Sequence, residues 1–93
     1  MAQNTTITLT PETWTQLTDA DVSSITFQNT GGYHILIKGT TDATAPTNAA
    51  GAIRANPGQG ELNVLMADLF PGIVAKRLWA FSSQAVGVFV SHA

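Results

Sequence analysis

The stretch LWAFSSQAVGVFVSHA, residues 78–93, contains no Asp, Glu, Lys or Arg. Its pattern predicts two β-strands, at residues 76–82 and 86–91, with apolar side chains on both faces. A strand such as 86–90 has no obvious solvent side. Either the rest of a small fold or another chain must therefore cover both of its surfaces. The stretch indicates a small all-β module that associates with other proteins.

The whole chain is short and poor in charge. Its 93 residues suit a single domain that spans residues 1–93. Charged residues make up 11% of the chain, against about 25% in typical globular domains, and the net charge is −2. Weak charge repulsion favours association, and the scattered cations form no basic stripe of the kind that a nucleic-acid-binding protein carries. The absence of cysteine excludes disulfides and thiolate metal sites.

Two features of the sequence bear on the compartment. Residues 1–10 have neither the basic start nor the continuous apolar run of a signal peptide. No apolar run approaches the roughly 18 residues of a membrane-spanning helix. We therefore expect a protein that is made in the cytoplasm, does not enter a membrane, and stays soluble unless it joins a larger assembly.

Alternation of polar and apolar residues predicts short strands in the first half of the chain. Residues 5–10 alternate threonines with apolar residues, and residues 24–28 alternate in the same way. The Asn-Thr-Gly-Gly sequence at 29–32 favours a tight turn, because Asn and Gly tolerate positive φ. Residues 33–38 read as the returning strand, so the pattern predicts a β-hairpin over 24–38.

The second half continues with short extended segments. Residues 39–51 contain no large apolar side chain and predict a long surface loop. Residues 67–70 predict one helical turn. A further strand at 61–66 is expected to place its apolar residues on one side: Leu62, Val64 and Met66. Seven or eight short strands with little helix predict an all-β fold, either a small antiparallel β-sandwich or a jelly-roll-like barrel.

Side chains able to carry catalysis or to hold a metal are scattered along the chain. His34 and His92 have no partner at the spacing that a metal site or a catalytic triad needs. Asp19 and Asp21 resemble a fragment of a calcium-binding loop but lack its central glycine and its bidentate glutamate. Capping of a turn explains these two residues better. We therefore expect no enzyme, no cofactor and no metal site.

The aromatic side chains remain as candidates for a binding surface. Trp79 and Phe81 share one face of their predicted strand, and Trp79 suits either the core of the domain or a contact between subunits. Trp14 and Tyr33 suit a platform on which a sugar stacks, or a protein-binding hot spot. The residues expected at an interface are Trp14, Tyr33, Trp79, Phe81, Val88 and Phe89.

Three segments together resemble the small β-sandwich proteins among the virion structural proteins of tailed bacteriophages and related particles. They are residues 14–17 (Trp-Thr-Gln-Leu), residues 25–32, and the ending at 78–92, where a Trp-Ala strand precedes a Val-rich strand. The resemblance implies a non-enzymatic accessory protein on the outside of a virion head. Such a protein is either a decoration (cement) protein or the base that attaches a head fibre or spike.

The same resemblance implies partners. These are the major capsid protein or other virion proteins, and a homo-oligomer, with a trimer favoured. We expect residues 78–92 and the loop 39–51 to make the contact, with many weakly bound copies attaching together. Two alternatives stay open: a carbohydrate-binding module that uses Trp14 and Tyr33, and a tail or connector component that assembles into rings.

Overall fold

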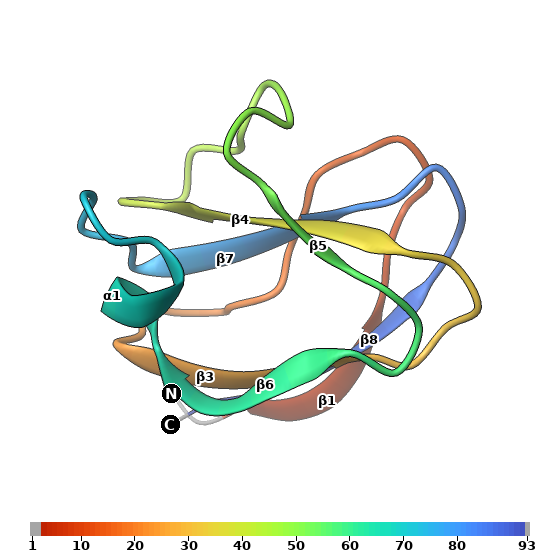
Figure 1. Ribbon diagram of the computed structural model, residues 1–93, viewed down its shortest axis with the longest axis horizontal. Helices are drawn as coiled ribbons and strands as arrows, with labels where there is room; N and C mark the ends of the chain where they lie inside the picture. The colour runs from red at the N-terminus through yellow and green to blue at the C-terminus, as the bar shows by residue number, and fades with distance from the viewer. Residues whose placement is uncertain (1–2, 93) are drawn as a thin grey trace.

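The computed structural model describes residues 3–92, which form eight strands and one helical turn (Figure 1). The strands are β1 (Gln3–Thr8), β2 (Thr15–Gln16), β3 (Ser24–Asn29), β4 (Ile35–Thr40), β5 (Ile53–Ala55), β6 (Gly60–Leu65), β7 (Arg77–Phe81) and β8 (Gly87–His92), and the helix α1 (Met66–Leu69) follows β6. They build two four-stranded antiparallel sheets, β1-β8-β3-β6 and β2-β7-β4-β5, which face each other. The predicted all-β sandwich is confirmed.

The strands pair as one long hairpin would. β1 pairs with β8, β2 with β7, β3 with β6, and β4 with β5. The connection 41–52 is the tip of this hairpin. Because the hairpin folds over on itself, β3 also pairs with β8, and β4 also pairs with β7. An eight-stranded double sheet with this order is a jelly roll. The fold is therefore a β-sandwich with the strand order of a jelly roll.

The nearly charge-free strands at the end of the chain occupy the middle of both sheets. β7 lies between β2 and β4, and β8 lies between β1 and β3. Their inward side chains Leu78, Val88 and Val90 are fully buried between the sheets. Burial of each such side chain contributes about 1.5–3 kcal/mol. The opposite sheet of the same chain therefore supplies the cover that the inner faces need.

Residues 24–38 do not form the predicted hairpin. β3 and β4 belong to different sheets, and residues 30–34 carry the chain from one sheet to the other. A turn sequence shows that the chain reverses direction. It does not show in which sheet the next strand finds its partners, because distant strands decide that pairing.

Asn29 holds this crossing between the sheets. Its side chain is fully buried, and its Nδ2 donates to the carbonyl oxygens of Tyr33 (2.7 Å) and Ala55 (3.1 Å). Its Oδ1 accepts a hydrogen bond from the backbone N–H of Gly31 (3.0 Å). A buried amide is stable only with such partners, so Asn29 ties the end of β3 to Tyr33, within the crossing, and to β5.

A β-bulge in β6 sets the face on which Leu62 lies. Leu62 and Asn63 together oppose the single residue Thr26 of β3. Asn63 adopts a φ of 47°, and its backbone N–H donates to Thr26 Oγ1 (2.7 Å). The extra residue breaks the two-residue alternation. The predicted shared face of Leu62, Val64 and Met66 is therefore wrong, since Leu62 is 86% exposed and Met66 is 1% exposed.

The long connection between β4 and β5 begins later than predicted. Gly39, expected in the loop, is a buried residue of β4. A Cβ at this position would lie 2.8 Å from a ring carbon of Phe70, so glycine lets the segment after α1 pack on the strand. Lys38 Nζ donates to the backbone oxygen and to Oδ1 of Asn48, both at 3.2 Å. These bonds tie the connection to the sheet.

Candidate functional site

The structure does not gather the six predicted interface residues on one surface. Val88 is fully buried in the core. The interface prediction is corrected there, because no partner reaches this side chain in the folded chain. Phe89, half-buried, alternates with buried neighbours and faces outward from the sheet β1-β8-β3-β6. Tyr33 is exposed in the connection between β3 and β4.

The other three residues lie together on the outer face of the sheet β2-β7-β4-β5. The ring centroids of Trp14 and Phe81 are 5.4 Å apart, with the planes tilted by 45°. Trp79 lies on the same face of β7 but is only 7% exposed, and its Nε1–H donates to Thr40 Oγ1 (2.9 Å). A buried Trp needs such a partner for its N–H. Of the two alternatives for Trp79, the structure favours burial within its own chain.

The most exposed apolar side chains lie elsewhere, mainly along β6 and the segment after α1. Within residues 3–92, the large apolar side chains that stay exposed are Tyr33, Leu62, Leu65, Ile73 and Val74. Apart from Tyr33, all of them belong to the span 62–74. The alternation of the sequence does not predict this exposed group. One sequence signal for it was available. The pair Ile73-Val74, which follows Pro71-Gly72, is apolar and lies outside any alternating strand.

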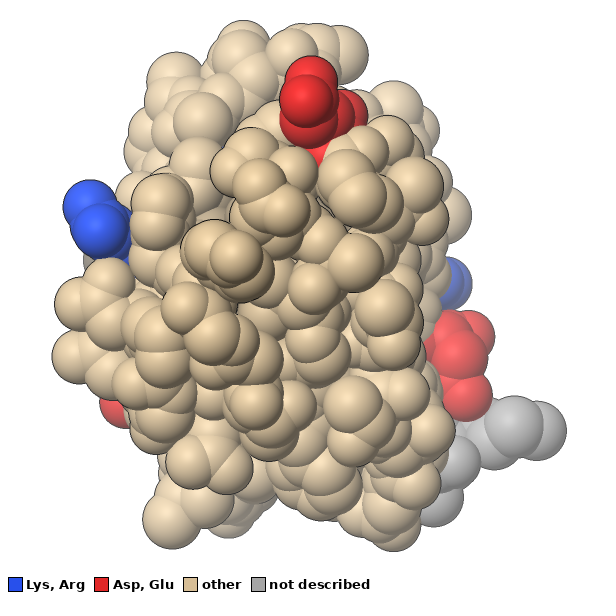
Figure 2. All heavy atoms as spheres, turned by 90° about the vertical axis from the view of Figure 1, so that its right-hand side faces the viewer, with Lys and Arg blue, Asp and Glu red and all other residues tan. Residues whose placement is uncertain are grey.

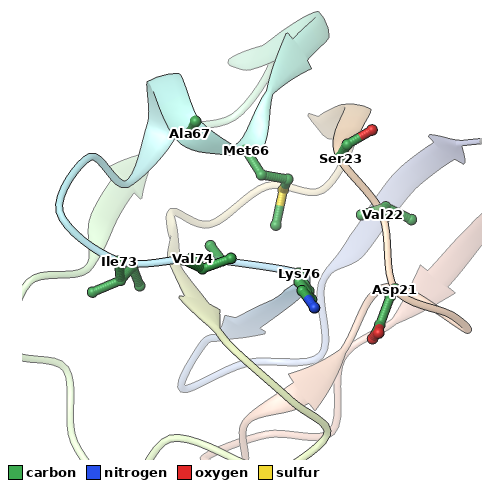
Figure 3. Close-up of a pocket in the computed structure, with 9 residues that line it drawn as sticks. Asp21, Val22, Ser23, Met66, Ala67, Ile73, Val74 and Lys76 are labelled. Atoms are coloured by element: carbon green, nitrogen blue, oxygen red, sulfur yellow. The ribbon is translucent and has the colours of Figure 1, made fainter.

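Part of this span forms a pocket of about 520 Å³, here called the apolar pocket (Figure 3). The pocket opens between α1, residues 21–23 and residues 73–76. Met66, Val22 and Ala75 are buried, whereas Ile73 and Val74 are 48% and 68% exposed. The lining residues are Asp21, Val22, Ser23, Met66, Ala67, Ile73, Val74, Ala75 and Lys76.

Main-chain hydrogen bonds hold the walls of the apolar pocket in place. The backbone N–H of Val22 donates to the carbonyl oxygen of Lys76 (2.9 Å), and that of Met66 donates to Ser23 (2.8 Å). Three segments far apart in the sequence are thus fixed to one another. The pocket is part of the folded framework, and the side chains of Asp21 and Lys76 add one charge of each sign to its lining.

The opposite end of the sandwich has a different character. It is formed by the connections β1–β2, β3–β4, β5–β6 and β7–β8, and Figure 2 shows its centre free of Lys, Arg, Asp and Glu side chains. One acidic group lies on the upper part of this face, and the other charged groups in the view lie at its margins. Tyr33 is the exposed large side chain of the β3–β4 connection.

The histidine and the aspartates singled out in the sequence make separate contacts. His92 is buried, with Nε2 at 2.9 Å from Gln3 Oε1 and 3.2 Å from Asp19 Oδ1. Asp21 Oδ1 instead pairs with Arg77 Nε at 2.7 Å. In the part of the chain that the structure describes, no group of three or more His, Cys, Asp or Glu is placed to hold a metal. No helix within residues 3–92 has the length and apolar character to cross a membrane.

Comparisons of the chain with protein-family models, with curated proteins and with solved structures find no match. The resemblance to virion proteins therefore stays a prediction. Jelly rolls include viral capsid domains, lectins and cupins, and the fold alone does not choose among them. The surfaces of the molecule therefore have to indicate its function.

Proposed function

We propose that this protein is a non-enzymatic accessory protein of a virion, which binds the outer surface of the capsid through the apolar pocket. The observation that carries the proposal is the exposure of Ile73 and Val74 beside the buried side chain of Met66. Contiguous exposed apolar side chains on a folded domain mark sites of association. The resemblance of three segments to phage decoration and head-fibre proteins supports the choice of a capsid as the partner.

The energetics suit attachment in many copies. Burial of an isoleucine or valine side chain contributes about 1.5–3 kcal/mol, and ordering of the two partners offsets part of this gain. Each copy therefore binds with modest affinity. A capsid offers many equivalent sites, and copies linked in an oligomer, of which we favour a trimer, gain from effective concentration. The low net charge of −2 keeps repulsion between neighbouring copies small.

Co-sedimentation with empty capsid shells of the virus that encodes the chain tests the proposal. The wild-type protein is expected to pellet with the shells, and the double variant Ile73→Ser/Val74→Ser is expected to stay in the supernatant. Both positions are exposed, so the variant is expected to keep the wild-type unfolding midpoint within a small margin. Tyr33→Ser is the matched control, because it removes an exposed apolar side chain outside the span 62–74 and should still pellet.

Two results would overturn the proposal. If the wild-type protein never pellets with shells, the capsid is not its partner. If the double variant pellets as well as the wild type does, the apolar pocket is not the contact. Rings of the free protein in electron micrographs would favour the tail or connector alternative.

A further inference from the structure

A second hollow, here called the groove, lies on the outer face of the sheet β1-β8-β3-β6. It has a volume of about 280 Å³ and is lined mainly by Thr26, Gln28, Gly60, Glu61, Leu62 and Phe89. The strand register explains its course, because Gln28 of β3 lies opposite Phe89 of β8 on one side and opposite Gly60 of β6 on the other. The groove therefore crosses three strands. It is separate from the apolar pocket.

The groove has apolar walls and a polar floor. Phe89 of β8 forms one wall, and Leu62, which the bulge in β6 turns outward, forms the other. Thr26 and Gln28 are alternate residues of β3, so their side chains project from the same face about 7 Å apart. Glu61 also belongs to the lining, but it lies opposite the buried Phe27, so its side chain leaves β6 on the core side and not on the outer face. No lysine or arginine belongs to the lining.

The hydrogen bonds of the floor leave defined groups for a ligand. Gln28 Nε2 donates to the carbonyl oxygen of Gly58 (3.2 Å), which orients the amide and leaves its Oε1 as an acceptor. Thr26 Oγ1 accepts from the backbone N–H of Asn63, so its own hydroxyl hydrogen is available as a donor. The floor thus offers an acceptor and a donor over a short distance.

This combination suits a flat, neutral ligand that has apolar faces and hydroxyl groups around its edge. A pyranose ring presents C–H groups to an aromatic or aliphatic wall and donates hydroxyl hydrogens to amide oxygens. A negatively charged sugar or a phosphate would find no lysine or arginine in the lining to balance its charge. The surrounding face does not change this preference, because the residue opposite Phe89 on β1 is the uncharged Thr6.

We propose that the groove between Phe89 and Leu62 binds a neutral saccharide, with one sugar ring between the two apolar side chains and its hydroxyls on Thr26 and Gln28. The site differs from the Trp14 and Tyr33 platform expected from the sequence, which lies outside this groove. It is also independent of capsid attachment. A protein docked through the apolar pocket is able to bind the sugar at the same time.

Isothermal titration with a panel of uncharged oligosaccharides tests this site. The panel holds the hexamers of the cello-, malto-, xylo-, manno- and N-acetylchito- series. At least one of them is expected to bind with a Kd of about 1 mM or tighter. Gln28→Ala, which removes the amide acceptor, and Phe89→Ala are each expected to weaken that binding about tenfold or more.

Control variants separate this site from the rest of the surface. Trp14→Ala removes an aromatic side chain from the other sheet and should leave the affinity unchanged. If Phe89→Ala does not fold, the exposed Leu62→Ser replaces it as the test of the wall. The proposal is overturned if no oligosaccharide of the panel binds. It is also overturned if the affinity falls in Trp14→Ala but not in Gln28→Ala, or if Gln28→Ala and Leu62→Ser abolish pelleting with capsid shells while saccharide binding is unchanged. The last result would make the groove a protein contact.

Discussion

This molecule has two strongly apolar regions: the strands β7 and β8, and residues 62–74. They differ in what covers them. β7 and β8 are central strands with a neighbour on each side and a sheet across the core. Residues 62–74 belong to the edge strand β6, a single helical turn and the segment after it. They have fewer neighbours, and their large side chains stay exposed. Position in the sheet order decides exposure here, more than composition does.

This difference matters for function because it changes the surface on which we expect a partner to bind. An apolar strand in the middle of a sheet is satisfied by its own fold and leaves little for a partner. An apolar residue at an edge has no internal partner, so another molecule gains by covering it. The proposed capsid contact therefore lies on the apolar pocket and not on residues 78–92.

The largest effect should come from a truncation in a central strand. Leu78→Ala removes a fully buried side chain of β7 and leaves a cavity, so we expect a loss of about 2–5 kcal/mol in the free energy of unfolding. Val74→Ala changes an exposed side chain and should cost within about 0.5 kcal/mol. Urea denaturation of both variants measures the contrast. Equal losses would show that the two regions are covered alike.

The next largest effect is expected at the crossing between the sheets. Asn29→Ala removes both donors to the carbonyl oxygens of Tyr33 and Ala55, and we expect a loss of about 2–4 kcal/mol. Asn48→Ala, in the exposed connection 41–52, is the matched control and should cost at most about 1 kcal/mol. Thermal or urea unfolding of both variants measures the loss in the free energy of unfolding. A neutral Asn29→Ala would mean that the amide does not hold the crossing.

A smaller effect is expected on the outer face of β7. Trp79→Phe keeps an aromatic ring but loses the hydrogen bond to Thr40, which should cost about 1 kcal/mol besides the smaller packing volume. Thr40→Val should add little to the Trp79→Phe variant if the two groups act as a pair, and a double-mutant cycle measures the coupling. Pelleting with capsid shells should not change. If Trp79→Phe has wild-type stability but no longer pellets with the shells, Trp79 contacts a partner after all.

The smallest effect concerns the exposed connection 41–52. The backbone N–H of Thr44 donates to Asp42 Oδ1 (2.8 Å) and lowers the pKa of Asp42 below its usual value of 3.8. A lowered pKa means that the ionised carboxylate stabilises the fold at pH values above 3.8, and that this contribution disappears as the pH falls through the folded-state pKa. Asp42→Asn should remove that part of the acid dependence. An NMR titration midpoint at or above 3.8 for Asp42 would contradict the observed hydrogen bond.

The sequence predicts the elements of this fold better than their partners. Alternation marks β1 and β3, the nearly charge-free apolar run marks β7 and β8, and the helical turn predicted at 67–70 is found at Met66–Leu69. These signals are local and need only a few residues. The partner of β3 is set by strands more than thirty residues away, so the Asn-Gly turn at 29–32 suggests a hairpin that does not form.

The candidate surfaces were harder to predict for the same reason. The apolar pocket joins three separate segments through main-chain hydrogen bonds, and no residue spacing in the sequence predicts that these segments lie together. The groove at Phe89 depends on the bulge at Asn63, which turns Leu62 outward. Trp79 lies on the expected outer face, yet it is covered by its own chain and bonded to Thr40.

Amide hydrogen exchange of the free protein and of the protein bound to capsid shells compares the two regions most directly. We predict that the amides of β7 and β8 are already the slowest in the free chain and exchange only through global unfolding. Binding should add protection at residues 65–76 and leave β7 and β8 unchanged. Fast exchange of β7 and β8 in the free chain, with protection gained there on binding, would contradict a fold that covers its own apolar strands.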